Sequence, residues 1–206
     1  MLGREDIMAH DNPGARPEAK LDVITIGRSS VDLYGQQIGS RLEDIASFAK
    51  SVGGCPANIA IGTARLGLKS GLITRVGDEQ MGRFIREQSA REGVAVDGIA
   101  TDKERLTALV LLAVEAEGVS PMIFYRSDCA DMALEEGDID PAFMARARAV
   151  VVTGTHFARP KPEAAQRKAM KLMRENRGKV VLDIDYRPNL WGLAGHAAGD
   201  NRYIAS

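Results

Sequence analysis

Short, β-branched apolar runs alternate along this chain with longer segments whose apolar residues recur at helical spacing. Such runs are typical of buried strands, and consecutive strands joined by a helix run parallel because the helix carries the chain back over one face of the sheet. The predicted strands span residues 21–27, 70–76, 149–154 and 179–186, and the predicted helices span residues 56–66, 79–92, 141–148 and 161–177. This alternation predicts an open α/β fold built on a mostly parallel sheet.

Two segments break the alternation. Residues 31–50 contain a polar stretch with glycines, and residues 106–115 and 119–126 form two strand-like runs around a turn at 116–118. Turn residues between two such runs indicate a hairpin. Both segments lie near the carboxyl ends of core strands, where ligands bind in open α/β sheets. The sequence therefore predicts a small β layer, or lid, over a site, made by segments at about 33–50 and 100–127.

The composition is typical of a globular protein, with 45% hydrophobic and 27% charged residues and a formal net charge of −1. Because there is no strongly basic region and no run of 18 apolar residues, we expect neither a nucleic-acid nor a membrane partner. Two cysteines are too few for a disulfide framework, which favours a reduced, cytoplasmic chain, and the three histidines lack metal-site spacing. Residues 1–20 lack the apolar core of a signal peptide and are predicted to be a disordered leader.

Two adjacent glycines, Gly53 and Gly54, stand directly before the first predicted helix. They permit positive φ and let a ligand approach the backbone, because no Cβ stands in the way. Pro56 presets φ for the expected first helical position. Asn58 then falls in the first turn, where its amide can donate to and accept from a bound polyol. The alternative interpretation is an ordinary strand-to-helix turn that binds nothing.

Further polar residues are expected at the same edge of the sheet. Asp32 comes shortly after the first strand, where its carboxylate can accept hydrogen bonds from two sugar hydroxyls; its alternative role is a helix or turn cap. Tyr125 and Arg126 end the predicted hairpin and can place an aromatic ring and a guanidinium over a ligand. Arginine suits bidentate recognition of a carboxylate. For Arg126 the alternative is a solvated residue at a strand end.

Three charged residues, Asp183, Asp185 and Arg187, fall at the end of the last predicted strand. Strand alternation places them on one side, and Pro188 directs the chain out of the sheet. Such a cluster can position charge in a ligand site, and the alternative is a self-paired surface network. His156 also lies near a strand end, but we expect it to be structural.

The spacing of Gly53-Gly54, Asn58, Ala60, Gly67 and Gly77 resembles, position for position, the first signature of the ribokinase-like (pfkB) carbohydrate kinases. The resemblance runs over residues 21–206 and covers the N-terminal portion of such a kinase, which implies a ribokinase-like sheet with helices on both faces and a small β lid. Residues 27–37, 124–134 and 183–188 are most similar to the branch that phosphorylates 5-dehydro-2-deoxy-D-gluconate in myo-inositol catabolism. Kinases of 2-keto-3-deoxygluconate, or of another sugar, are the alternative within the family.

This resemblance implies ATP-dependent phosphorylation of a primary hydroxyl of a sugar acid. ATP is the implied cofactor, with Mg²⁺ carried by the nucleotide and no metal site on the protein. The residues implied to hold the sugar are Asp32, Gly53, Gly54, Asn58, Tyr125 and Arg126. Asp185 and Arg187 are implied to face the nucleotide, with Arg187 acting catalytically by stabilising charge on the transferred phosphoryl group. A homodimer formed through the lid is a further expectation.

One part of the family pattern is missing. The second signature is an Asp-Thr-x-Gly-Ala-Gly-Asp type of segment that supplies the catalytic aspartate, and it does not occur in the 206 residues. Gly199-Asp200 is only a two-residue echo of it. We therefore expect the C-terminal part of the fold to be absent and the chain by itself to be inactive, because it lacks the general base. A non-catalytic sugar-binding module is the alternative from another functional class.

Overall fold

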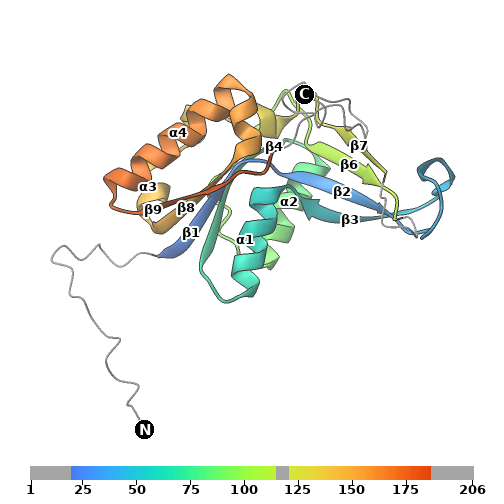
Figure 1. Cartoon of the computed structure of the whole chain (residues 1–206), viewed down its shortest axis with the longest axis horizontal. Coiled ribbons are helices and arrows are strands. Elements are labelled where there is room, and N and C mark those ends of the chain that lie inside the picture. The colour runs from blue at the N-terminus through green and yellow to red at the C-terminus, as the bar shows by residue number, and fades with distance from the viewer. Residues whose placement is uncertain (1–19, 115–120, 187–206) are drawn as a thin grey trace, which may run out of the picture.

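The computed structural model describes residues 20–114 and 121–186. Within these residues the main sheet consists of parallel strands in the order β5-β4-β1-β8-β9 (Figure 1). They are β1 (Leu21–Ile26), β4 (Ser70–Gly77), β5 (Ile99–Asp102), β8 (Ala147–Thr153) and β9 (Lys179–Asp183). The central strand β1 is almost entirely buried, as expected when both faces of a parallel sheet are covered. The predicted parallel sheet is therefore confirmed.

Helices cover both faces of the main sheet (Figure 1). One face carries α1 (Cys55–Arg65) and α2 (Gln80–Arg91), whose buried residues form one core cluster with β4 and β5. The other face carries α3 (Pro141–Ala145) and α4 (Pro160–Glu175), which form a second core cluster with β1 and β8. Removing these apolar faces from water is the main force that holds the layers together. The expected open α/β fold, with helices on both faces, is present.

A second, smaller sheet stands at one end of the main sheet (Figure 1). Its order is β3-β2-β6-β7, formed by β2 (Ser30–Gly35), β3 (Phe48–Gly53), β6 (Ala108–Leu112) and β7 (Met122–Tyr125). β2 runs antiparallel to β3 and parallel to β6, and β6 pairs antiparallel with β7 as a hairpin requires. The predicted turn at 116–118 lies outside the described residues. The small β layer expected from the two insertions is thus confirmed.

Three elements illustrate how the structure differs from the sequence prediction. β5 is a main-sheet edge strand of four residues, too short to show a period, so the expected lid segment from residue 100 begins in the main sheet. α3 ends at Ala145, earlier than expected, because β8 already begins at Ala147 to pair with β1. β9 ends at Asp183, since Asp185 adopts a positive φ of 29° and leaves the extended conformation.

The other regular elements are short 3-10 helices, η1 (Leu42–Asp44), η2 (Ala130–Ala133), η3 (Glu136–Asp138) and η4 (Gly154–Ala158). The predicted leader, residues 1–20, falls outside the described residues except for Lys20. None of the helices in the described ranges is long and apolar enough to cross a membrane.

Candidate functional site

A cavity of about 490 Å³ lies between the small sheet, the start of α1 and the segments that follow β1 and β9. Five of the residues predicted to bind a ligand line it: Asp32, Gly54, Asn58, Arg126 and Asp185. Its position, outside the carboxyl ends of parallel strands, is where open α/β sheets bind ligands. The fold therefore brings residues that are far apart in the sequence together around one cavity.

Gly53 and Gly54 are required because neighbouring atoms lie too close to leave room for a Cβ at either position. Gly54 has φ 94°, and a Cβ there would lie 2.5 Å from the carbonyl oxygen of Arg28. Gly53 ends β3, and a Cβ there would overlap the carboxylate of Asp32. Only Gly54 of the pair adopts positive φ. The glycines thus let the start of α1 lie directly against the segment after β1, which places Asp32 and Asn58 in one cavity.

Asp32 and Asn58 supply the hydrogen-bonding groups expected for a polyol. The Asp32 carboxylate accepts a hydrogen bond from the Ser30 hydroxyl at 2.8 Å. Burial raises the pKa of Asp32, while the Ser30 hydrogen bond and the charge of Arg28 act in the opposite direction. Asn58 is exposed to the cavity, and its backbone N–H donates to the Gly54 carbonyl at 2.9 Å in the first turn of α1.

The lid strand β7 places Phe124 and Arg126, but not Tyr125, on this cavity. Successive side chains of a strand point to opposite faces. Tyr125 is therefore on the other face, where it is 56% exposed and lines a second cavity of about 590 Å³. The register of β7 thus turns Tyr125, which was expected to cover the ligand, away from the first cavity. Phe124 is the aromatic residue of this strand that lines that cavity. The Arg126 side chain is only 11% exposed, so it is not a solvated strand-end residue.

Arg28 and Asp131 were not singled out as site residues in the sequence. Arg28 lines the cavity directly after β1, and Asp131 lies behind it in η2. The Asp131 carboxylate is within ion-pair distance of both Arg28 and Arg126, at 3.5 and 3.8 Å. Burial raises the pKa of Asp131 to about 6, against the opposing effect of Arg28. A single acid within the otherwise apolar run of residues 129–134 was the available signal for a buried charge.

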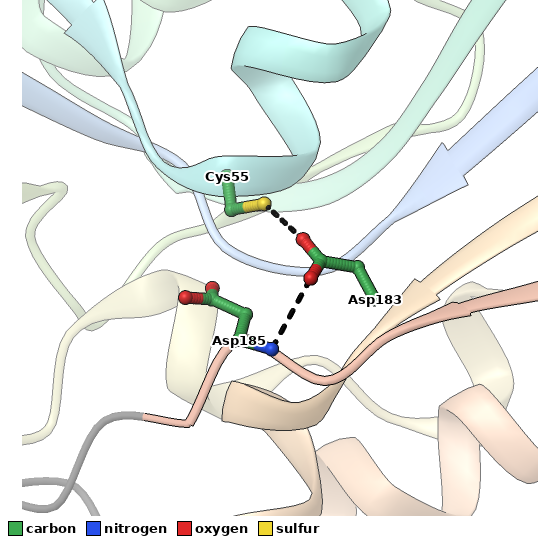
Figure 2. Close-up of side chains that lie close together, drawn as sticks. All are labelled: Cys55, Asp183 and Asp185. Atoms are coloured by element: carbon green, nitrogen blue, oxygen red, sulfur yellow. Dashed lines mark hydrogen bonds between the residues drawn. The ribbon is translucent and has the colours of Figure 1, made fainter.

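Three side chains, Cys55, Asp183 and Asp185, meet where α1 begins and β9 ends (Figure 2). The Cys55 thiol donates to the Asp183 carboxylate at 2.8 Å, and the Asp185 backbone N–H donates to the same carboxylate at 3.2 Å. Asp183 and Asp185 are thus together as predicted, but through a turn rather than through strand alternation. Arg187 lies outside the described residues.

The ligand atoms of these three residues lie within 4.8 Å of one another, which is close enough for a shared cation. Mg²⁺ prefers oxygen ligands and is usually held by one or two carboxylates together with phosphates, whereas a thiol suits softer metals. The two carboxylates are therefore ligands of the type that Mg²⁺ prefers, and the thiol is not.

His156, expected to be structural, is fully buried in η4. Burial, helped by the charge of Arg28, lowers the pKa of His156 to about 3. It is therefore a neutral imidazole at physiological pH. It does not line the cavity, so it stands behind the site rather than in it.

Comparison with known proteins gives matches over most of the chain. A model of the pfkB family of carbohydrate kinases matches residues 20–197. The 5-dehydro-2-deoxygluconokinase of Geobacillus kaustophilus (strain HTA426) is 40% identical over 172 residues, or 83% of this chain and 51% of the relative. The protein of the same name from Listeria monocytogenes serovar 1/2a is 37% identical over 84% of this chain and 54% of the relative. The chain thus spans about half the length of the curated relatives it matches.

Solved structures match the fold over a similar extent. A PfkB protein from Polaromonas sp. JS666 is 34% identical, with a TM-score of 0.78 over 83% of this chain and 58% of that one. A sugar kinase from Pyrococcus horikoshii in complex with ATP is 28% identical, with a TM-score of 0.75 over 82% of this chain and 55% of that one. Both the main sheet and the small sheet lie within residues 20–197, the range that the family model matches.

Proposed function

The chain belongs to the pfkB family of carbohydrate kinases, and from this premise we propose that it forms the sugar-binding part of a kinase that phosphorylates a primary hydroxyl of a sugar acid. The observation that carries the proposal is the composition of the cavity. Asp32 and Asn58 provide acceptors and donors for hydroxyls, and the buried guanidinium of Arg126 provides a positive charge for a carboxylate. A neutral pentose would leave that charge without a partner on the ligand.

The proposed substrate is 5-dehydro-2-deoxy-D-gluconate, converted to its 6-phosphate. The names of the curated relatives support it, and so does a cavity that combines hydroxyl-binding groups with arginine. The second candidate is 2-keto-3-deoxygluconate, which has the same two chemical features. The two acids differ in where the carbonyl and the hydroxyls stand along the carbon chain, so a direct comparison of affinities distinguishes them.

The described residues act by positioning. Hydrogen bonds between the sugar and the side chains of Asp32 and Asn58 orient the sugar. The side chains of Met122 and Phe124 cover part of the cavity and displace water. ATP supplies the phosphoryl group and Mg²⁺ neutralises its charge when both are bound. We propose that the carboxylate of Asp185, which lines the cavity beside Asp183, would face the Mg²⁺ carried by the nucleotide, and that Arg187 would stabilise the transferred phosphoryl group.

The general base that takes the proton from the sugar hydroxyl is not assigned to any residue of this chain. The second family signature is missing from its 206 residues. Removal of that proton in the transition state contributes on the order of 10²–10⁴ in rate. We therefore propose that the chain binds the sugar acid but does not turn it over by itself. A cytoplasmic location and a homodimer through the lid remain predictions.

The test measures binding and turnover by the same preparation. The 206-residue chain is titrated calorimetrically with 5-dehydro-2-deoxy-D-gluconate and with 2-keto-3-deoxygluconate, and ADP release is followed with Mg-ATP and each acid. The Geobacillus kaustophilus relative serves as the control for the assay. The expected result is saturable binding, tighter for the first acid, without ADP release. ADP release would place the base within residues 1–206, and absence of binding to either acid would overturn the proposed function.

A further inference from the structure

Asp183 joins two segments that form walls of the cavity. Its Oδ2 atom accepts a hydrogen bond from the Cys55 thiol at 2.8 Å, and its Oδ1 atom accepts one from the Asp185 backbone N–H at 3.2 Å (Figure 2). Cys55 and Asp185 both line the cavity, whereas Asp183 is not among its described lining residues. One carboxylate therefore ties the first residue of α1 to the turn that follows β9.

The start of α1 carries groups that face the ligand. Cys55 and Asn58 lie one turn apart on this helix, and both line the cavity. The N-cap of the helix is a glycine, so no side chain caps it. The Thr25 hydroxyl donates to the Pro56 carbonyl at 2.8 Å and ties this turn to β1, while the Cys55 thiol ties it to Asp183 in β9. Loss of the second contact would let the start of α1 shift, and Asn58 with it.

The turn after β9 adopts a conformation that depends on its surroundings. Asp185 has φ 29°, which residues other than glycine rarely adopt and which persists where neighbouring groups hold it. On one side the turn lies against η4, because a Cβ at Gly154 would overlap the carbonyl oxygen of Ile184. The Asp183 carboxylate provides a second contact by accepting the Asp185 N–H. Together these contacts hold Asp185 on the cavity wall.

We propose that Asp183 is a positioning residue for the sugar acid, which acts through Cys55 on the start of α1 and through the backbone of Asp185 on the turn after β9. This inference rests on the proposed function and deepens it, because it names the residue that sets the spacing of two walls between which the sugar binds. Groups that bind a ligand must be held within about 0.5 Å of the productive geometry. Loss of the Cys55–Asp183 hydrogen bond therefore weakens binding, although Asp183 itself does not line the cavity.

Asp183→Ala separates positioning from charge. The ligand is an acid, so removal of a nearby negative charge would by itself strengthen its binding. Positioning predicts the opposite: in calorimetric titration with 5-dehydro-2-deoxy-D-gluconate, the 206-residue variant should bind about tenfold more weakly than wild type. Unchanged or tighter binding by Asp183→Ala would overturn the inference while leaving a sugar-binding function intact. A wild-type chain that does not bind the acid would overturn the proposed function, and the inference with it.

Two substitutions of Cys55 test the hydrogen bond itself. Cys55→Ala removes the donor and should weaken binding of the acid about fivefold. Cys55→Ser keeps a donor at the same place, so its affinity should stay within about twofold of wild type. A serine variant that binds as weakly as the alanine variant would contradict a role for this hydrogen bond. The pair also provides the measurement on which the inference stands if Asp183→Ala fails to fold.

A double-mutant cycle and a matched control complete the test. If Cys55 acts through Asp183, Cys55→Ala should add less than about twofold to the effect of Asp183→Ala. Thr63→Val is the control, because Thr63 donates to the Ile59 carbonyl at 2.7 Å about two turns further along α1 and does not line the cavity. It should lower the free energy of unfolding and leave affinity unchanged. Additive effects in the cycle, or an equal loss of affinity in Thr63→Val and Cys55→Ala, would overturn the positioning role.

Discussion

Gly54 is the N-cap of α1 and lies close to the backbone of Arg28 and Ser29 after β1. Its φ is 94°, and a Cβ would lie 2.5 Å from the Arg28 carbonyl oxygen. Gly54→Ala must therefore both adopt a strained conformation and move Arg28. We expect it to lower the free energy of unfolding by about 2–4 kcal/mol and to weaken binding of the sugar acid about tenfold. Urea denaturation and calorimetric titration measure the two effects.

Gly67→Ala is the matched control for this substitution. Gly67 has φ 90°, but a Cβ there meets nothing within 4 Å. It therefore reports the cost of positive φ alone, about 1–2 kcal/mol, and should leave ligand affinity unchanged. Equal effects of the two substitutions on both stability and affinity would show that the close approach at Gly54 contributes nothing.

His156 provides a pH-dependent prediction at the same scale. Burial first, and then the charge of Arg28, lower its pKa to about 3 in the folded chain, against an ordinary value of 6.5. As the pH falls below 6.5 the unfolded chain takes up a proton that the folded chain does not, so the stability contributed by the neutral imidazole is lost. His156→Leu removes this titration. Relative to wild type, its free energy of unfolding should rise by roughly 2–3 kcal/mol between pH 7.5 and 4.5.

This difference is obtained from urea denaturation of both proteins at the two pH values. Asp131, whose pKa is raised to about 6 by burial, titrates in the same range, but it is present in both proteins and its effect largely cancels in the comparison. If the difference in free energy of unfolding between wild type and His156→Leu did not change with pH, the pKa of His156 would not be lowered in the folded chain.

At the scale of elements, Glu79 joins the start of α2 to the start of the lid strand β6. Its carboxylate accepts hydrogen bonds from the backbone N–H groups of Met81 at 2.6 Å, Gly82 at 3.2 Å and Thr107 at 3.1 Å. Burial alone would raise the pKa of Glu79, but these hydrogen bonds and one from the Thr107 side chain outweigh it, so the pKa is lowered. The ionised carboxylate therefore stabilises the fold at neutral pH, and this contribution is lost as the pH falls below the ordinary value of 4.5.

Glu79→Ala should lower the free energy of unfolding at pH 7 by about 1–3 kcal/mol, because it removes a helix cap and leaves buried N–H groups without a partner. Thermal or urea denaturation checks this value. Glu104→Ala is the control, since its side chain is 86% exposed and its ion pair with Arg105 is long, at 4.0 Å. It should change stability by less than about 0.5 kcal/mol. A loss of the same size in both variants would assign the effect to charge rather than to capping.

The elements of the main sheet were predictable because their signal is local. β1, β4, β8 and β9 are runs of apolar residues, and the helices between them repeat at helical spacing, so each element is visible within its own window. β5 was missed because four residues, of which Ile99 and the acid Asp102 are buried, have the pattern of neither a core strand nor an alternating one. Its strand character comes from pairing with β4, which is a tertiary contact.

The site was predictable where residue type and chain position were sufficient. Asp32, Asn58 and Arg126 follow strands or begin a helix at the edge where ligands bind, and all three line the cavity. The direction of Tyr125 was not predictable, because it depends on the register of β7, in which Tyr125 pairs with Leu109. The contacts of Asp131 also depend on three segments meeting, and no single stretch of sequence contains that information.

At the scale of the whole molecule, β9 is an edge strand of the main sheet among the residues that the structure describes. β9 is the last strand of the described sheet, and its residues Val181 and Leu182 are 49% and 57% exposed. Because successive residues point to opposite faces, apolar surface is exposed on both sides of this strand. An exposed apolar edge strand is a template for pairing with another chain. The 206-residue chain should therefore self-associate in a concentration-dependent way.

Leu182→Lys tests whether this edge is the surface that associates. A charge on an edge strand opposes pairing, so sedimentation velocity should show a larger monomer fraction for the variant than for wild type at the same concentration. Leu66→Lys is the matched control, because Leu66 is 85% exposed at the end of α1, away from any sheet edge.

A dimer through the lid would behave differently. It would persist in Leu182→Lys and weaken in Tyr125→Lys, because the Tyr125 side chain is exposed on the outer face of β7. The pattern across the three variants therefore separates association through the sheet edge from association through the lid, and a wild-type chain that stays monomeric at high concentration would contradict both.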